Sequence, residues 1–300
     1  MQPLPRRTFL AGGLAAGSLV LAACGGSDDD SNDAGGGAGT AEAELAFLVA
    51  TFPDGFRQQA TVVAGPEQRI AFVVADQIDN LRDTAPATLD LVIAGADGNL
   101  LETAVERRVD GIITPYYAAT LTFPAAGQYT ASLPGHPDVA PVDFLVLDRA
   151  AVPIPQVGDS LPVVPTATFV DLKGVADLCT RAVECPFHEI DLIDAAANDK
   201  PTVLLVATPG FCQTDICGPV VDLLMDEAAD RDDLNVIHAE VYVDPADFET
   251  GAFPDLTDVV NAAALPFEPA LFVADADNVI LARLDTTFDR SELRAALALV

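Results

Sequence analysis

The spacing of hydrophobic positions changes near the middle of this chain. Between residues 45 and 148, short runs alternate apolar and polar residues, a period of two that is typical of half-buried antiparallel strands. The predicted strands are 60–63, 69–74, 87–93, 118–123, 127–133 and 142–147, with a hairpin turn at 96–99. We therefore expect an all-β, immunoglobulin-like sandwich in this half.

Beyond residue 165 the pattern changes to alternating strands and helices. The segment 202–207, continuously apolar from Val203 to Ala207, predicts a buried strand, 220–229 a helix, and 235–243 a second strand. A hairpin of strands 269–274 and 279–284 follows, and 289–292 opens a last helix with a capping-box-like start. The order β-α-β, then β-β-α, predicts an α/β domain with helices on both faces of its sheet.

The first 24 residues have the form of an export signal. Arg6 and Arg7 precede an apolar run at 11–23, which is shorter than the ~18 residues needed to span a membrane. The paired arginines resemble a twin-arginine signal. The sequence 21–24, Leu-Ala-Ala-Cys, resembles a bacterial lipobox, which implies cleavage before Cys24 and attachment of a diacylglyceryl lipid to its sulfur. The expected location is the outer face of the bacterial cell membrane, held there by the lipid.

The composition of the chain and its Gly-rich and Pro-rich segments suggest the remaining domain boundaries. We expect a signal peptide at 1–23, a flexible tether rich in Gly, Asp and Ser at 24–43, the β-sandwich at 44–150, a stiff Pro-rich linker at 151–165 that spaces two domains, and the α/β domain at 166–300. The formal net charge is −31, and loss of Arg6 and Arg7 with the signal leaves −33. Such a surface repels nucleic acid and anionic lipid headgroups, so only the lipid on Cys24 is expected to hold the chain at a membrane.

Four of the five cysteines remain once Cys24 is lipidated, an even number in a compartment where disulfides persist. Three pairings are open. The local pairing joins Cys179 to Cys185, in a turn-like stretch where a structural disulfide is expected, and Cys212 to Cys217.

Cys212 and Cys217 lie where the strand 202–207 gives way to a helical pattern that starts near residue 213. Free amide groups and the dipole at a helix N-terminus favour a thiolate, which is the reactive form of cysteine. This junction is therefore the candidate catalytic site, with Cys212 as the attacking sulfur and Cys217 as the resolving one.

Residues 157–300 resemble a thioredoxin-fold domain. The lead-in 157–162 is similar to that of exported thioredoxin-like proteins, and 267–273, Phe-Glu-Pro-Ala-Leu-Phe-Val, is similar to the family's cis-proline strand. The resemblance implies a cis bond before Pro269, and a substrate-binding edge at Glu268 and Pro269 beside the cysteines. The chain departs from the family in that four residues, not two, separate Cys212 from Cys217.

Three functions fit these features. The first is a thiol-disulfide oxidoreductase that needs no cofactor or metal and acts on protein disulfides or thiols. The second is Cu(I) binding at Cys212 and Cys217, because the segment resembles the Cys-Pro-Asp-Ile-Cys-Pro stretch of Sco-type copper chaperones. Those chaperones add a histidine ligand, for which His238 and His188 are the candidates here; the favoured interpretation is that His238 packs in an apolar strand and that His188 is a surface residue. The third is a lipid-anchored binding module with a permanent disulfide, and peroxiredoxin chemistry ranks below all three.

Overall fold

The computed structural model describes residues 47–50, 61–75, 85–212 and 216–300. The predicted signal peptide, the lipidated Cys24, the tether and residue 213 lie outside these ranges, so their interpretation stays a prediction. Within the described ranges no helix is both long enough and apolar enough to cross a lipid bilayer.

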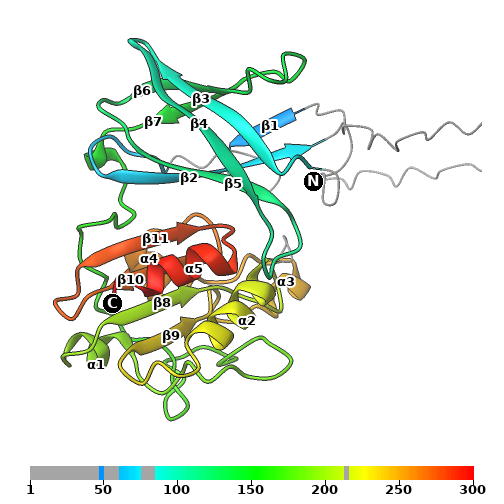
Figure 1. The fold of residues 1–300 in the computed structure, drawn as a ribbon. Helices are drawn as coiled ribbons and strands as arrows, with labels where there is room; N and C mark the ends of the chain where they lie inside the picture. Colours follow the sequence, from blue (N-terminus) through cyan, green and yellow to red (C-terminus); the bar gives the residue numbers. More distant parts are fainter. Residues whose placement is uncertain (1–46, 51–60, 76–84, 213–215) are drawn as a thin grey trace, which may run out of the picture. The chain divides into compact units, whose positions relative to one another are not determined.

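The first half forms one seven-stranded antiparallel sheet in the order β1-β2-β5-β4-β3-β6-β7 (Figure 1). Its strands are β1 (Phe47–Ala50), β2 (Glu67–Ala75), β3 (Thr88–Gly95), β4 (Gly98–Arg108), β5 (Tyr116–Thr122), β6 (Gly127–Ser132) and β7 (Val142–Val146). The expected hairpin at 96–99 joins β3 to β4. Five of the six predicted strands are present, and β1 and β4 are additional. Of the predicted strand 60–63, the described residues 61–63 contribute a single bridge, at Val63.

This sheet curls, because the chain before β2 hydrogen-bonds to the chain after β7. Ala64 donates to the carbonyl of Leu147, and Leu147 donates to that of Val62. β4 pairs along most of its length with β3 and only at its end with β5, through Arg107 and Arg108. The β-rich character is as expected, but all seven strands belong to one hydrogen-bonded sheet, so the immunoglobulin-like sandwich is not confirmed.

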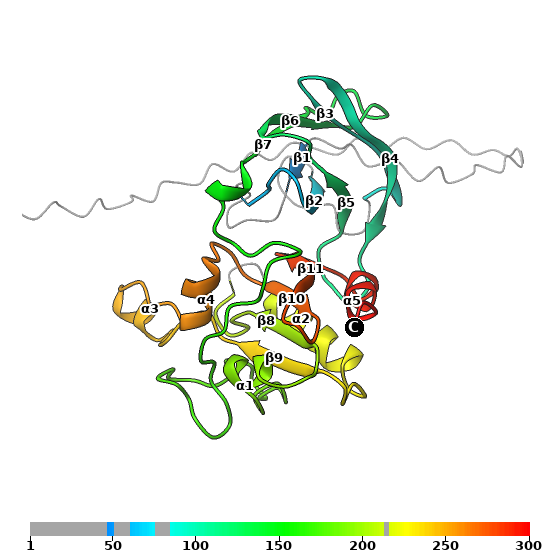
Figure 2. The same ribbon diagram turned by 90° about the vertical axis from the view of Figure 1, so that its left-hand side faces the viewer.

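The second half contains a four-stranded mixed sheet in the order β11-β10-β8-β9 (Figures 1 and 2). Its strands are β8 (Thr202–Val206), β9 (Asn235–Ala239), β10 (Ala270–Ala274) and β11 (Ile280–Asp285). β8 runs parallel to β9 and antiparallel to β10. The helices are α1 (Leu192–Ala196), α2 (Cys217–Glu227), α3 (Asp247–Thr250), α4 (Asp258–Ala263) and α5 (Arg290–Leu297), and a 3-10 turn, η2 (Arg149–Ala151), precedes them.

Alternation along β8 distributes its side chains between two apolar cores. Val203 and Leu205 pack with α2 and α5, whereas Leu204 and Val206 pack with α1 and α4. Because successive side chains of a strand point to opposite faces, a strand covered by helices on both faces is apolar throughout. The predicted β-α-β, then β-β-α order is confirmed in this half, as is the cap of α5, where Asp289 accepts a hydrogen bond from the amide of Glu292.

The Pro-rich connector packs into the protein instead of spacing two domains. Val152, Ile154 and Leu161 are buried in the core that α1 and α4 cover, and the Gln156 side chain accepts a hydrogen bond from Gln68 of β2. The expectation of a spacer considered only the stiffness of proline. It did not allow for the apolar residues between the prolines, which gain free energy by leaving water.

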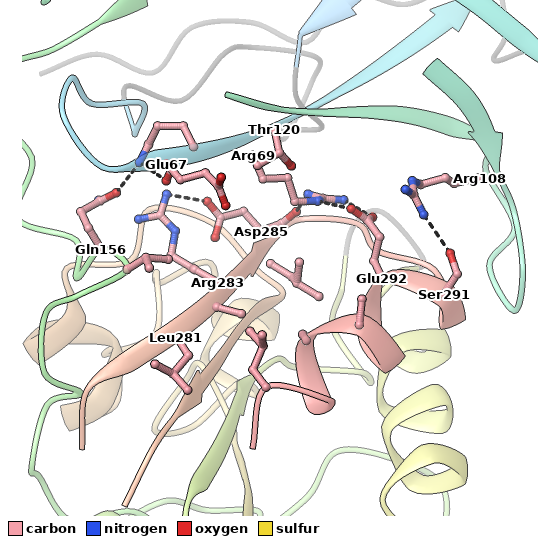
Figure 3. Close-up of a pocket in the computed structure, with 17 residues that line it drawn as sticks. Glu67, Arg69, Arg108, Thr120, Gln156, Leu281, Arg283, Asp285, Ser291 and Glu292 are labelled. Carbon is pink, nitrogen blue, oxygen red and sulfur yellow. Dashed lines mark hydrogen bonds and ion pairs between the residues drawn. The ribbon is translucent and has the colours of Figure 1, made fainter. Parts of the chain in front are cut away.

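A buried ion pair joins β2 to the last helix (Figure 3). The Arg69 guanidinium donates two hydrogen bonds of 2.7 Å to the Glu292 carboxylate, and the Tyr116 hydroxyl donates to the same carboxylate. Burial alone would raise the pKa of Glu292, but the charge and hydrogen bonds of Arg69 outweigh it and lower that pKa. Removing one partner would leave a buried charge without compensation.

We therefore expect Glu292→Gln to destabilise the protein by about 3 to 5 kcal/mol, measured by urea unfolding. The matched control is Asp233→Asn, which removes a carboxylate from an exposed pair with Arg231. Solvent screens that pair, so the control should unfold at nearly the wild-type urea concentration. Equal losses in the two variants would contradict the importance of the buried pair.

Candidate functional site

Cys212 and Cys217 lie on either side of the start of helix α2. Cys217 is the first residue of that helix and is fully buried, whereas Cys212 precedes the helix and is half-buried. Pro219 falls in the first turn of α2, where a missing amide hydrogen costs no intrahelical hydrogen bond. The expected arrangement, a cysteine before the helix and a cysteine on it, is therefore present.

The backbone amide of Cys217 donates a hydrogen bond of 3.4 Å to the sulfur of Cys212. This amide is one of the donors that a helix N-terminus leaves without a partner inside the helix. A donor aimed at sulfur stabilises negative charge there, so the geometry favours a Cys212 thiolate.

Cys217 faces the carboxyl group of Glu268. Its thiol lies 3.6 Å from Glu268 Oε2, and the amide of Thr208 donates to the same oxygen at 2.6 Å. The hydrogen bond to Cys212, burial and the negative charge of Glu268 together raise the pKa of Cys217. Burial, with a contribution from Cys212, raises the pKa of Glu268 to about 7.

The bond between Glu268 and Pro269 is cis, as the resemblance implies. Pro269 immediately precedes strand β10, which pairs with β8 and so brings Glu268 beside the cysteines. The sequence placed Glu268 at a substrate-binding edge. The structure shows its carboxylate in contact with the buried cysteine, and its role toward a substrate stays a prediction.

Cys179 and Cys185 lie in the irregular segment before α1, and both are buried. Their sulfur atoms are 4.0 Å apart and not joined, whereas a disulfide is about 2.05 Å long. The hydrogen bond from Cys185, with contributions from His188 and His238, lowers the pKa of Cys179 against the opposing effect of burial. The structural disulfide between them stays a prediction.

The two histidines near this pair are fully buried. His238 lies on β9 and is buried as expected, but its ring faces the sulfurs. The expectation of His188 at the surface is wrong, because its ring packs between Phe169 and His238. The local sequence of His188 is polar and turn-like, and it does not reveal that the chain folds back over this residue.

A separate cavity of about 340 Å³ lies between β2, β11 and α5 (Figure 3). Its three arginines all have partners: Arg69 pairs with Glu292, Arg283 with Asp285, and Arg108 with Ser291 and Asp289. Among the described residues, no cysteine or histidine lines this cavity. Because each arginine of the cavity already pairs with a carboxylate, we do not treat this cavity as the candidate functional site.

Comparisons with known proteins leave the family open. No family model and no curated protein matches the chain. A solved structure described as "C-terminal domain of putative thiol-disulfide oxidoreductase from Bacteroides thetaiotaomicron" aligns with 48% of this chain and 98% of its own, at 10% identity and a TM-score of 0.32. A metagenome-derived glycoside hydrolase family 9 endoglucanase aligns with 29% of this chain and 17% of its own, at 18% identity and a TM-score of 0.22. Both TM-scores are low, so the geometry of the cysteines has to carry any function.

The loop before Cys212 is held by the segment that contains Cys179. Gly210 donates a hydrogen bond to the Thr180 hydroxyl, and a Cβ atom at Gly210 would lie 2.7 Å from the backbone oxygen of Thr180. We expect Gly210→Ala to push the two segments apart and to lower the midpoint of thermal unfolding.

The matched control for this substitution is Gly218→Ala, in the first turn of α2, where an added Cβ meets nothing within 4 Å. Because alanine favours a helix over glycine, this variant should keep or slightly raise the midpoint. A midpoint for Gly210→Ala at or above that of Gly218→Ala would show that the close contact with Thr180 does not constrain the loop.

Proposed function

We propose that this chain is a thiol-disulfide exchange protein in which Cys212 attacks and Cys217 resolves. The observation that carries the proposal is the environment of the pair: an amide at the start of α2 donates to Cys212, and a carboxyl group lies beside the buried Cys217. The half-buried sulfur thus has a donor that favours the thiolate, and the buried sulfur has a group that can take its proton.

The exchange conserves atoms and electrons. The Cys212 thiolate attacks one sulfur of a partner disulfide, a mixed disulfide forms, and the other partner sulfur leaves as a thiolate that takes a proton from water. Cys217 then transfers its proton to Glu268 and attacks Cys212, which forms the Cys212–Cys217 disulfide and releases the second partner sulfur. The partner gains two electrons and this chain loses them, and the reverse sequence oxidises a partner dithiol.

A thioredoxin-like domain in an exported lipoprotein is the setting that we infer for this chemistry. The order β11-β10-β8-β9, with α2 starting after β8 and a cis bond before Pro269, supports the domain assignment. The signal and lipobox at 1–24 support attachment to the outer face of the cell membrane through Cys24. Thiols and disulfides of other exported proteins are then the substrates within reach.

The copper alternative draws less support from the described residues. A Cu(I) site at Cys212 and Cys217 would be expected to recruit a histidine, as in the chaperones that the segment resembles. His188 and His238 instead face Cys179 and Cys185. Within the described ranges, the group that lies beside Cys217 is a carboxylate, which is a poorer ligand for a soft metal.

Substitution of the resolving cysteine tests the order of attack. We expect Cys217→Ser to accumulate a mixed disulfide between Cys212 and glutathione when oxidised glutathione is added, detected by mass spectrometry of the intact chain. Cys212→Ser should form no such adduct at Cys217, because that sulfur is buried. An adduct on Cys217 would contradict the proposed order of attack, and a wild-type Cys212–Cys217 disulfide that resists mild reductant would favour a permanent disulfide instead.

Glu268 should make the resolving step depend on pH. Its raised pKa of about 7 means that the carboxyl is protonated below that pH and accepts a proton above it. The rate at which Cys217 releases glutathione from Cys212 should therefore rise as pH increases through about 7. In Glu268→Gln we expect a rate about 10²-fold lower and without this rise, followed by stopped-flow measurements.

The control for this experiment is Glu249→Gln, which changes an exposed carboxyl far along the chain from the cysteines. It should keep both the rate and its pH profile. An unchanged profile in Glu268→Gln would remove Glu268 from the proposed proton transfer, while the exchange itself would still be tested by the cysteine variants.

A further inference from the structure

Two cysteines and two histidines converge in the core beneath helix α2. Cys179, Cys185 and His188 come from the irregular segment before α1, and His238 comes from strand β9. All four side chains are buried, and one ligand atom from each lies within 4.8 Å of the other three. This group is separate from Cys212, Cys217 and Glu268, and the proposed exchange reaction does not use it.

Four of the six distances between ligand atoms of the group are close to those of a tetrahedron around a metal ion, and the other two are within 4.8 Å. Cys185 Sγ lies 3.2 Å from His188 Nε2 and 3.3 Å from His238 Nδ1, while Cys179 Sγ lies 3.8 Å from His238 Nδ1 and 4.0 Å from Cys185 Sγ. Zinc bonds of about 2.3 Å to sulfur and 2.0–2.1 Å to nitrogen, in tetrahedral geometry, separate ligand atoms by about 3.3–3.8 Å. Movements of a few tenths of an ångström would bring these four distances between ligand atoms to the spacing of a tetrahedral zinc site.

The ring of His238 is held in the form that can bind a metal. Its Nε2 lies 3.0 Å from the carbonyl oxygen of Ala207, which can only accept a hydrogen bond, so Nε2 carries the hydrogen. In the neutral ring Nδ1 then presents its lone pair, and this is the atom that faces the two sulfurs. A backbone carbonyl that fixes the outer nitrogen of a ligand histidine is the usual support of a zinc site.

A disulfide between Cys179 and Cys185 accounts for less of this arrangement. It would need the sulfur atoms to approach by about 2 Å, and it gives no role to two imidazoles buried against them. The ring nitrogens that face the sulfurs are His188 Nε2 and His238 Nδ1, so both imidazoles point a possible ligand atom at the same centre. A metal ion at the centre would give all four groups a partner at once, through one atom of each.

We propose that Cys179, Cys185, His188 and His238 bind one zinc ion in a closed structural site. Two thiolates balance the charge of Zn²⁺, which suits a site without water, whereas a monovalent copper ion would leave a net negative charge in the core. Binding replaces the hydrogens of two thiols, so two protons leave for each zinc ion that enters, and no electron is transferred.

The zinc site would also hold the loop that leads to the exchange cysteines. Thr180, next to Cys179, donates through its amide and hydroxyl to Glu240 and accepts a hydrogen bond from the amide of Gly210. Gly210 lies two residues before Cys212. Fixing Cys179 on a metal therefore fixes the segment on which this loop rests.

The test uses the full chain without its signal and without a histidine tag, purified under anaerobic reducing conditions. We expect one zinc per chain by elemental mass spectrometry, and X-ray absorption at the zinc edge should show two sulfur and two nitrogen neighbours. Co²⁺ in place of zinc should give the absorption of tetrahedral cobalt bound to thiolate. These measurements need no variant and do not depend on folding after a substitution.

Two sets of variants then place the metal. Cys185→Ser and His238→Gln should lose most of the zinc, while the double variant Cys212→Ser, Cys217→Ser should retain it. Removing zinc from the wild-type chain with a chelator should speed hydrogen exchange at the Gly210 amide. A reduced chain that takes up no zinc from a competing indicator, a preference for Cu(I), or zinc lost from the Cys212, Cys217 double variant alone would each overturn the site.

Discussion

The hydrogen bonds just after strand β8 orient the side chains of both candidate sites. The carbonyl of Ala207 accepts from the ring of His238, and the next amide, that of Thr208, donates to Glu268. The Thr208 hydroxyl accepts from the amide of Val241 and so ties the chain after β9 to the same point. The two residues that follow this strand, Ala207 and Thr208, thus orient a histidine toward one pair of cysteines and a carboxylate toward the other. Because β8 is apolar and covered on both faces, this point cannot shift without loss of core packing.

The pattern of apolar residues was enough to predict much of the fold, because it reports burial directly. The run 203–207 has no polar residue on either face until Thr208, and such a run fits a central strand. The same reasoning missed β4, in which Glu102 and Glu106 lie exposed and obscure any alternation. Strand β2 packs Ile70 and Phe72 into the core of its own sheet and Ala71 and Val73 into the core under α2. A strand shared by two cores gives no local signal of what covers its second face.

The placement of Cys212 and Cys217 was also visible in the sequence, since a cysteine before a helix and another in its first turn are local features. The role of Glu268 was only partly visible. Its position before a proline at the start of a strand could be seen, but the contact with Cys217 depends on β10 lying beside β8. The four-residue Cys and His group was missed because only three of its members, Cys179, Cys185 and His188, are close in sequence. The fourth, His238, lies 50 positions beyond His188, and only the fold brings it to the others. A histidine inside an apolar strand could have signalled it, because such a ring needs a partner for each nitrogen.

The two pairs of cysteines show that the same type of residue can have different chemical environments within a single core. Cys212 is half-buried, faces a helix amide, and can be approached by a second molecule, which exchange requires. Cys179 and Cys185 are enclosed and face imidazoles, so a partner disulfide cannot reach them, but a metal ion of small radius can be held. If both pairs were equally exposed, they would exchange disulfides with each other. In the proposed exchange reaction, the burial of Cys179 and Cys185 would keep them from reacting with Cys212 and Cys217. Thr180 links the two segments, because its hydroxyl accepts a hydrogen bond from the amide of Gly210.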